Sequence, residues 1–238
     1  MIVCTIMGHA VPFDFSMWDK EDSAIQRVVS LPGDEVEFLL CGDVDTNLFS
    51  WACTCLGACK KDFPRTHITV TMVAPKCRQK ALERDLVRRG HQVDRVVAPD
   101  LSSPGRPDRI SYQNRLVRWC IEQSTHVISY VYLPLATRWT RLYWYAKERG
   151  VNIIDIIDPQ TQDYILENIA RLPPRKQQIF QSMQDGKTLS EVAAQHNISA
   201  GHLNWIIHRE GQKLVDAIHR RLSVGHSSGS IFDPYIVL

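Results

Sequence analysis

The chain has 238 residues, of which 44% are hydrophobic and 23% are charged, as in an ordinary globular protein. No apolar run approaches the roughly 20 residues that a membrane-spanning helix needs, so we expect no membrane contact. The formal net charge is only +2, but residues 171–224 contain eight Lys/Arg and four Asp/Glu, whereas residues 1–170 contain 20 and 21. The positive excess therefore lies in the C-terminal part, where a polyanion would bind.

The N-terminus and the cysteines bear on where the protein works. Met1–Cys4 lacks the basic segment and the small-residue cleavage site of a signal peptide. The seven cysteines are an odd number and most lie in apolar segments, so we expect reduced thiols in a cytoplasmic protein. Cys53, Cys55 and Cys59 lie close together, but no second pair follows, as a zinc site would usually require. We therefore expect buried, inert thiols and no metal.

Residues 1–157 alternate between strand-like and helix-like segments. Six short runs, most of them rich in Val and Ile and bounded by Gly, Pro or Asp, have the composition of buried parallel strands. They are Ile2–Met7, Glu35–Cys41, His67–Ala74, Gln92–Ala98, Thr125–Tyr132 and Val151–Ile157. Helical spacing marks Thr46–Lys61, Gln79–Arg89, Ser111–Gln123 and Thr137–Arg149. The alternation predicts an α/β fold, a Rossmann-like parallel sheet with helices on both faces, which binds ligands beyond the carboxyl ends of its strands.

The pattern changes after Asp158-Pro159, because no further strand-like run follows before the C-terminal tail. Leu172-Pro173-Pro174 marks a boundary soon after this point. We therefore predict a Rossmann-like domain over residues 1–158, a connecting helix within 159–171, a small all-α domain over 172–224 and a tail over 225–238.

The predicted all-α domain contains two short helical segments and a longer one. Pro174–Gln184 has Pro in its first turn, where the missing N–H costs little. A second helix contains Leu189 and Val192, and Asn197-Ile198-Ser199 forms a tight turn whose serine can cap the third helix. Two helices joined by such a turn predict a helix-turn-helix, formed here by the second and third helices of this domain. The third helix would lie in the DNA major groove.

The same residues carry a resemblance to a known family. The matching positions are Leu172-Pro173, Gly186, the run from Leu189 to Ala193, Ile198-Ser199-x-Gly201, His208-Arg209 and Lys213-Leu214. Through them the segment resembles region 4 of sigma-70-type factors, especially the extracytoplasmic-function group. The resemblance implies a helix-turn-helix but not a sigma factor, because no segment resembles sigma region 2, which binds polymerase and melts the promoter.

The third helix supplies the candidate DNA-facing side chains, which are His202, Asn204, Trp205, His208 and Arg209. Asn204 can read adenine, whereas Ile206 stands where the family often has a basic residue. The alternative is that Trp205 and Ile206 pack on the N-terminal domain or on a second subunit. We expect phosphate contacts, or else an ordinary solvated surface, from Arg175, Lys176, Lys213, Arg220 and Arg221.

A second resemblance spreads over the N-terminal domain. Its residues are Cys4–His9, Phe38–Asp45, Asn114-Arg115 and Val127–Val131. They resemble the Rossmann-like superfamily (SLOG) named after the DNA-processing protein DprA and the LONELY GUY phosphoribohydrolases. The resemblance implies a nucleotide-derived ligand and a pocket wall made by Gly8, His9, Gly42, Asp45, Asn114 and Arg115. A Gly after a strand would let a phosphate approach the backbone, and the alternative role of these residues is turn and capping chemistry.

The sequence departs from this superfamily at most of its polar anchors. Ala10 and Gln113 replace Arg, Thr125 replaces Asp, and Pro134-Leu135 replaces a Gly-Gly pair. The last change matters most, because Pro lacks an N–H and both side chains crowd a phosphate. We expect a degenerate pocket with a changed ligand or none, with no cofactor and no complete catalytic set.

These observations support three hypotheses about function. The leading one is a bacterial DNA-binding transcription regulator or DNA-associated adaptor, whose Rossmann-like domain senses a small molecule or contacts a partner. The second is a nucleotide-processing enzyme with an accessory helix-turn-helix. The third is a protein-interaction module that contacts RNA polymerase or another protein. Because one helix-turn-helix makes few phosphate contacts, we also expect a homodimer or a partner to add more on duplex DNA.

Overall fold

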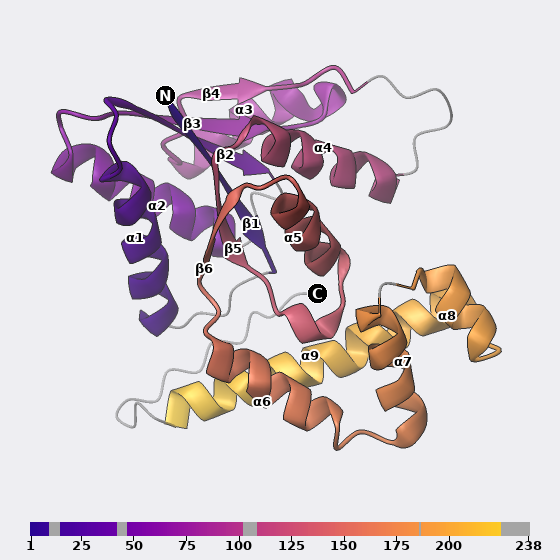
Figure 1. Cartoon of the computed structure of the whole chain (residues 1–238). Coiled ribbons are helices and arrows are strands. Elements are labelled where there is room, and N and C mark those ends of the chain that lie inside the picture. Colours follow the sequence, from indigo (N-terminus) through magenta and orange to yellow (C-terminus); the bar gives the residue numbers. More distant parts are fainter. Residues whose placement is uncertain (10–14, 42–46, 102–108, 186, 225–238) are drawn as a thin grey trace.

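The computed structural model describes residues 1–9, 15–41, 47–101, 109–185 and 187–224 of the chain. Gly42 and Asp45 of the predicted pocket wall lie outside these residues, as does the predicted tail over 225–238. Strands and helices alternate through residues 2–155, and the described elements after them are helices (Figure 1). The predicted fold class, an α/β part with a parallel sheet followed by C-terminal helices, is confirmed.

The described strands form one parallel sheet in the order β4-β3-β2-β1-β5-β6. They are β1 (Ile2–Gly8), β2 (Glu35–Cys41), β3 (His67–Val73), β4 (Arg95–Val97), β5 (His126–Tyr130) and β6 (Asn152–Asp155). β1 lies at the centre, with Cys4 opposite Phe38 of β2 and His126 of β5. The strand order reverses between β1 and β5, so their carboxyl ends form the topological switch point, where open α/β sheets usually bind ligands.

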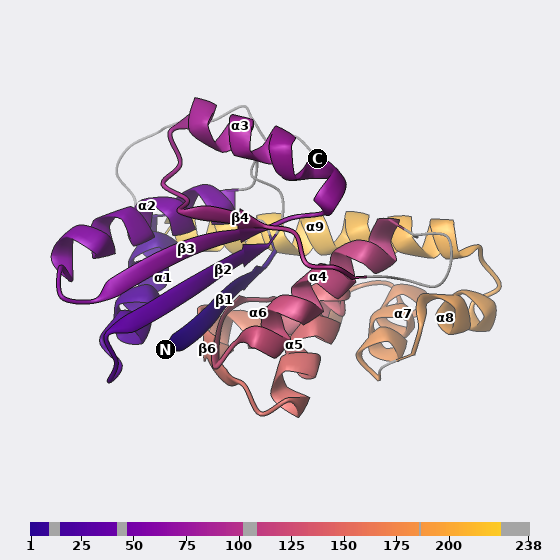
Figure 2. The same cartoon turned by 90° about the horizontal axis from the view of Figure 1, so that it is seen from above.

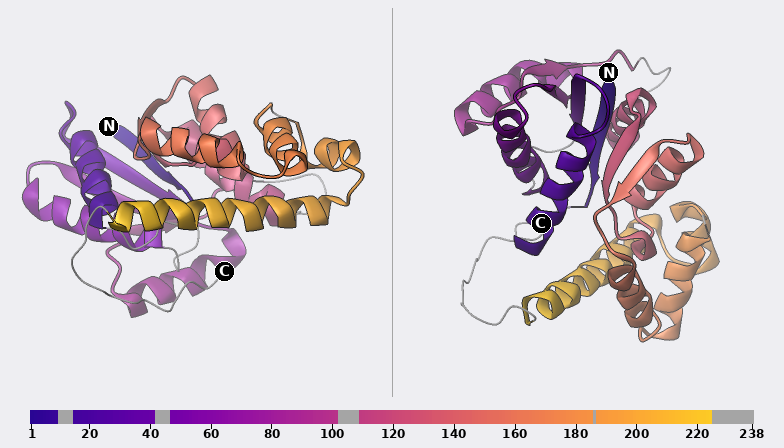
Figure 3. Two further views of the ribbon diagram at one scale, coloured as in Figure 1. Left: turned by 90° about the horizontal axis from the view of Figure 1, so that it is seen from below. Right: turned by 60° about the vertical axis from the view of Figure 1, so that its left-hand side comes forward.

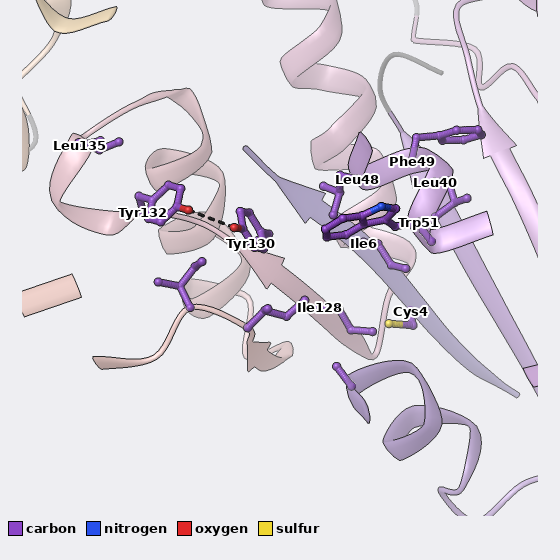
Figure 4. Close-up of a cluster of buried hydrophobic side chains, with 14 of the residues drawn as sticks. Cys4, Ile6, Leu40, Leu48, Phe49, Trp51, Ile128, Tyr130, Tyr132 and Leu135 are labelled. Carbon is purple, nitrogen blue, oxygen red and sulfur yellow. Dashed lines mark hydrogen bonds between the residues drawn. The ribbon is translucent and has the colours of Figure 1, made fainter. Parts of the chain in front are cut away.

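Helices cover both faces of the sheet (Figure 2). One face carries α1 (Phe15–Val29), α2 (Asn47–Asp62) and α3 (Gln79–Arg89), and the other carries α4 (Arg109–Gln123) and α5 (Arg138–Glu148). Because strand side chains alternate between faces, Ile6 and Ile128 pack with Trp51 of α2, whereas Met7 and Val127 pack against α4 and α5. Figure 4 shows part of the first cluster. Two short 3-10 helices, η1 (Lys76–Arg78) and η2 (Leu133–Leu135), follow β3 and β5.

The C-terminal helices are α6 (Pro159–Ile169), α7 (Pro174–Gln184), α8 (Leu189–Gln195) and α9 (Ala200–Val224). α9 is one 25-residue helix, and α6 lies beside it (Figure 3, left). Buried apolar side chains of α7, α8 and α9 belong to the same cluster as Leu135 of η2 and the α1–α2 face of the sheet. The C-terminal helices therefore pack on the α/β part, over the segment that follows β5. Among the described residues, none of the helices is long and apolar enough to cross a bilayer.

Candidate functional site

Helix α8 begins at a reciprocal cap. The Thr188 hydroxyl accepts a hydrogen bond from the Glu191 N–H at 3.3 Å, and a Glu191 carboxylate oxygen accepts one from the Thr188 N–H at 2.7 Å. The hydrogen bond from the Thr188 backbone lowers the pKa of Glu191 below its ordinary value. This capping box satisfies N–H groups that a helix start leaves free, so it fixes where the short α8 begins.

A tight turn joins α8 to α9. Asn197 has φ +51°, the left-handed conformation that Asn adopts more readily than most residues. The Ile198 N–H donates to the Ala193 carbonyl at 3.0 Å, and the Ser199 hydroxyl accepts the His202 N–H at 3.1 Å. Ser199 is thus the predicted cap of α9, and the turn fixes the direction in which α9 leaves α8.

Apolar side chains hold α7, α8 and α9 together. Phe180, Val192 and Leu203, one from each helix, are fully buried in the same cluster. Ile207, one turn after Leu203, is also buried in this cluster, and Ile206 is partly buried against it. The packing uses one side of α9 and leaves the other side exposed to solvent.

The exposed side of α9 carries all five candidate DNA-facing residues, namely His202, Asn204, Trp205, His208 and Arg209. Trp205 is 51% exposed, so it does not pack inside this chain as Ile206 does. Its ring is stacked with the His202 ring at 5.6 Å between centroids, and the Arg209 guanidinium lies 4.9 Å from the Trp205 centroid. The three side chains therefore form an ordered aromatic and basic platform, since stacking and the cation–π contact both restrict their rotamers.

Two of the predicted phosphate contacts have a partner within the chain. Glu210 of α9 is only 5% exposed, and its carboxylate pairs with the Lys176 ammonium at 2.8 Å and the Lys213 ammonium at 3.3 Å. The hydrogen bond from Lys176 is the main cause that lowers the pKa of Glu210. Two ammonium groups on one carboxylate leave one positive charge in excess beside α9.

The other basic candidates differ in their surroundings. The Arg175 guanidinium donates to the His196 carbonyl at 2.8 Å, so it supports the turn before α9. Arg220 is exposed further along α9 and donates to the Asp216 carbonyl. The Arg221 side chain lies outside the described part of the chain. Arg209, in contrast, has the Trp205 ring as its neighbour and forms no ion pair with any described residue.

At the switch point, the lack of a side chain at Gly8 allows β1 and β5 to pack closely. Its φ is +155°, and a Cβ added to it would lie 2.1 Å from the Tyr130 carbonyl oxygen of β5. The next N–H along the chain, that of His9, donates to the same carbonyl at 2.8 Å. Only glycine allows β1 and β5 to come this close here, so the structure itself explains why residue 8 has no side chain.

The His9 ring is held by hydrogen bonds at both nitrogens. Nδ1 accepts from the Tyr132 N–H at 3.3 Å, so the proton of the neutral ring resides on Nε2, which donates to the Thr137 hydroxyl at 2.8 Å. Burial lowers the pKa of His9 to about 4. The ring thereby ties the end of β1 to the segment after β5, and neither nitrogen is left for a ligand.

The segment after β5 has its backbone donors occupied. The Leu133 N–H donates to Gln162 of α6 at 3.0 Å, and the N–H groups of Leu135 and Ala136 donate to carbonyls of the same segment at 3.2 Å. Pro134 has no N–H, and its carbonyl accepts from Gln184 of α7 at 2.8 Å. A phosphate held here would need free N–H groups, and this segment offers none from residue 132 to 136.

The last two predicted pocket residues lie on α4. Asn114 lines a cavity of about 230 Å³ between η1, α3, α4 and α5, together with Cys41 at the end of β2. Arg115 is partly buried on the same helix and does not line this cavity. Arg78 and Arg138, which do line it, were not among the predicted site residues. The available signal was Thr137-Arg138, a helix cap followed by a cation just after a buried strand.

A larger hollow of about 760 Å³ lies between α1, β6 and the start of α6. Lys20 and Asp158, which both line it, pair at 2.8 Å, and the remaining charged lining residues are Asp19, Arg27, Asp155 and Asp163. Four carboxylates against two cations do not favour an anion here.

Cys53 and Cys59 are buried, as the sequence predicts, and Cys55 is half-buried against the same cluster. Burial raises the pKa of Cys53 and of Cys55 to about 12, and that of Cys59 to about 11. The described side chains contain no group of three or more His, Cys, Asp or Glu placed to hold a metal ion. A protonated thiol is a poor nucleophile and a poor ligand, so these cysteines act as core residues.

The comparisons with known proteins add no relative. A scan against protein-family models finds no family that matches the chain, and a search of curated proteins finds no similar sequence. The two resemblances therefore depend only on the residues quoted for them.

Proposed function

We propose that the chain binds duplex DNA through the exposed side of α9 and acts as a transcription regulator or DNA-associated adaptor. In this proposal α8, the turn at Asn197 and α9 form a helix-turn-helix with α9 in the major groove. The observation that carries it is the outward set of His202, Asn204, Trp205, His208 and Arg209, which begins in the first turn of α9. The resemblance to sigma-70 region 4 and the +4 balance of residues 171–224 support it.

The proposed contacts divide by chemistry. Asn204 would read an adenine edge, because its amide can donate and accept at the same base. Arg209 would contact a phosphate, and the surplus charge of Lys176 and Lys213 would strengthen attraction to the backbone. Trp205 would place an apolar surface against the groove, where a thymine methyl is the matching contact.

Fluorescence anisotropy of the full chain with labelled duplexes of mixed sequence, at low salt, tests the proposal. Arg209→Ala should weaken binding to every duplex and reduce the slope of log K against log salt by about one unit. Asn204→Ala should cost about 1–3 kcal/mol on a preferred site and little on others. Lys61→Ala, an exposed charge at the end of α2, is the matched control. Absence of binding at low salt, where attraction is strongest, would refute the proposal.

The platform on α9 also favours a second candidate, a protein-interaction module for RNA polymerase or another protein. Trp and Arg are the residues most enriched at the energetic centres of protein interfaces, and here Trp205 and Arg209 are in contact and exposed. Chromatography of the full chain with RNA polymerase, in the absence of DNA, separates the two. Co-elution that Trp205→Ala abolishes, without any DNA binding, would favour this candidate.

For the N-terminal half, we propose a degenerate SLOG-like domain that does not hold a nucleotide phosphate at the switch point. The occupied N–H groups of residues 132–136 and the locked His9 ring support this proposal. They also argue against the nucleotide-processing alternative. Calorimetry with nucleoside monophosphates should give weak binding or none, and micromolar binding would overturn this part of the proposal.

A further inference from the structure

The cavity beside Asn114 lies beyond the carboxyl ends of two strands. Cys41 at the end of β2 and Val73 at the end of β3 form its floor, and α3, α4 and α5 form its walls. Its volume of about 230 Å³ is below the roughly 300–1,000 Å³ typical of pockets for drug-sized ligands. Its position is one where α/β sheets bind ligands, and its size fits a small molecule.

Arg138 is the charged group of this cavity. Its partly buried guanidinium donates to the Gln113 side-chain carbonyl at 2.9 Å and lies 4.6 Å from the centre of the Trp139 ring. Both neighbours are neutral, and Arg138 forms no ion pair with a carboxylate of the described residues. Burial lowers the pKa of Arg138 below its usual value. A shielded charge is costly without a counter-charge, and the described residues supply none to this guanidinium.

The other charges on the wall do not supply that partner. Asp85 lines the cavity, but its carboxylate pairs with Arg88 at 3.0 Å. Arg78 adds a second guanidinium, which no carboxylate in the described part of the chain pairs with. Arg138 also stands in the first turn of α5, where the helix dipole favours an anion. The described lining of the cavity is therefore positive.

We propose that this cavity binds a small organic anion, with Arg138 as its charged anchor. The Asn114 and Gln113 amides would hydrogen-bond the anionic group, while Trp139 and Leu142 would contact an apolar body. The ligand is a carboxylate or a phosphate ester smaller than a nucleotide. The site adjoins the switch point, because Arg138 directly follows Thr137, which is bonded to His9 at the end of β1. None of its described lining residues belongs to α9, so it does not depend on the proposed DNA binding.

Calorimetry of the full chain with two probes, benzoate and inorganic phosphate, tests the proposal and separates the two chemistries. Saturable binding of benzoate alone assigns a carboxylate with an apolar body, and binding of phosphate assigns a phosphate group. Arg138→Gln should weaken binding about tenfold or more, because a hydrogen bond to a charged group is lost. Arg141→Gln removes the same charge from an exposed residue of α5 and should leave binding unchanged. Equal loss in both variants, or no saturable binding of either probe, would overturn the proposal.

A second measurement needs no substitution at Arg138. The Cys41 thiol lines the cavity, whereas the Cys77 thiol is exposed outside it. A bound probe should slow alkylation of Cys41 by iodoacetamide, read by mass spectrometry, and leave the rate at Cys77 unchanged. Ala81→Phe, which fills the cavity from its outer wall and keeps Arg138, should abolish that protection. Equal rates at Cys41 with and without a probe that binds would place the anion elsewhere and refute the proposed site.

Discussion

Replacing Gly8 by alanine tests whether this glycine is needed for the packing of the sheet, as distinct from the binding of a ligand. A methyl group at this position would lie 2.1 Å from the backbone oxygen of Tyr130 on the neighbouring central strand. Gly33 provides a matched control, because its φ of +147° is close to the +155° of Gly8, while a Cβ there would meet only the Ile2 side chain at 3.8 Å. The two substitutions therefore share the backbone strain and differ in the clash.

The magnitude follows from this difference. Backbone strain should cost each variant of the order of 1–3 kcal/mol in the free energy of unfolding. Gly8→Ala must in addition move β1 away from β5, and overpacking of this kind costs about 1–3 kcal/mol more. For a chain of this size, that extra cost corresponds to a melting temperature about 2–12 °C below that of Gly33→Ala.

Urea unfolding followed by circular dichroism measures both variants against the unsubstituted chain. We expect the two to have similar slopes against urea and the Gly8→Ala midpoint to be the lower, because the native fold is retained. If Gly8→Ala were no less stable than Gly33→Ala, the argument that Gly8 exists for the contact between β1 and β5 would be wrong.

Three further predictions concern titratable groups. Glu210→Gln should lower the free energy of unfolding by about 1–3 kcal/mol at neutral pH, since the charged hydrogen bonds from Lys176 and Lys213 are lost. Because the pKa of Glu210 is lowered in the folded chain, the difference in stability between the two chains should fade as the pH falls through that pKa. Urea titrations at several pH values would detect this. Glu21→Gln should show the opposite pH dependence. Burial, aided by Asp22, raises the pKa of Glu21 to about 8. The unsubstituted chain should therefore lose stability as the pH rises from about 4.5 through 8, and the variant should not show this loss. For His9, nitrogen NMR should show a neutral ring with the proton on Nε2 and a titration midpoint near pH 4, whereas a midpoint near 6.5 would contradict the buried, doubly bonded ring.

Some helices and strands begin and end at the residues that the sequence predicts. β2 (Glu35–Cys41), α3 (Gln79–Arg89) and α7 (Pro174–Gln184) have their predicted bounds. β4 is much shorter than the predicted Gln92–Ala98, because this edge strand pairs with one neighbour and has only Arg95–Val97 in register. Helical spacing and strand composition therefore give the order of elements, whereas pairing decides how long an edge strand is.

Helix α1 (Phe15–Val29) is not among the predicted elements. Its buried residues Ala24, Ile25, Val28 and Val29 have helical spacing, although its first half carries four charged residues. A βαβ crossover between β1 and β2 requires such an element. Both the spacing and the topology rule would have found the helix.

The site depends on contacts between segments that are distant in the sequence. Glu210 pairs with Lys176, which lies 34 residues earlier, and Gln184 bonds to the Pro134 carbonyl 50 residues before it. In the sequence, these Lys and Gln residues look like ordinary surface side chains. The exposed face of α9 could be predicted, because it follows from the spacing of Leu203 and Ile207 alone. The position of Arg138 in the cavity, with no carboxylate partner among the described residues, could not be predicted.

The occupied backbone N–H groups after β5 and the docking of the C-terminal helices involve the same residues. A Gly-Gly pair would leave N–H groups open above the switch point, but Pro134 has none and Leu135 is buried in the same cluster as the C-terminal helices, where a Cβ added to Gly211 of α9 would lie 4.0 Å from its side chain. Gln162 of α6 then takes the Leu133 N–H, and Gln184 of α7 donates to the Pro134 carbonyl. Because these two bonds join η2 to α6 and α7, neither helix can shift on the sheet without breaking one of them. The segment after β5 thus anchors α6 and α7, and α9 packs beside α6.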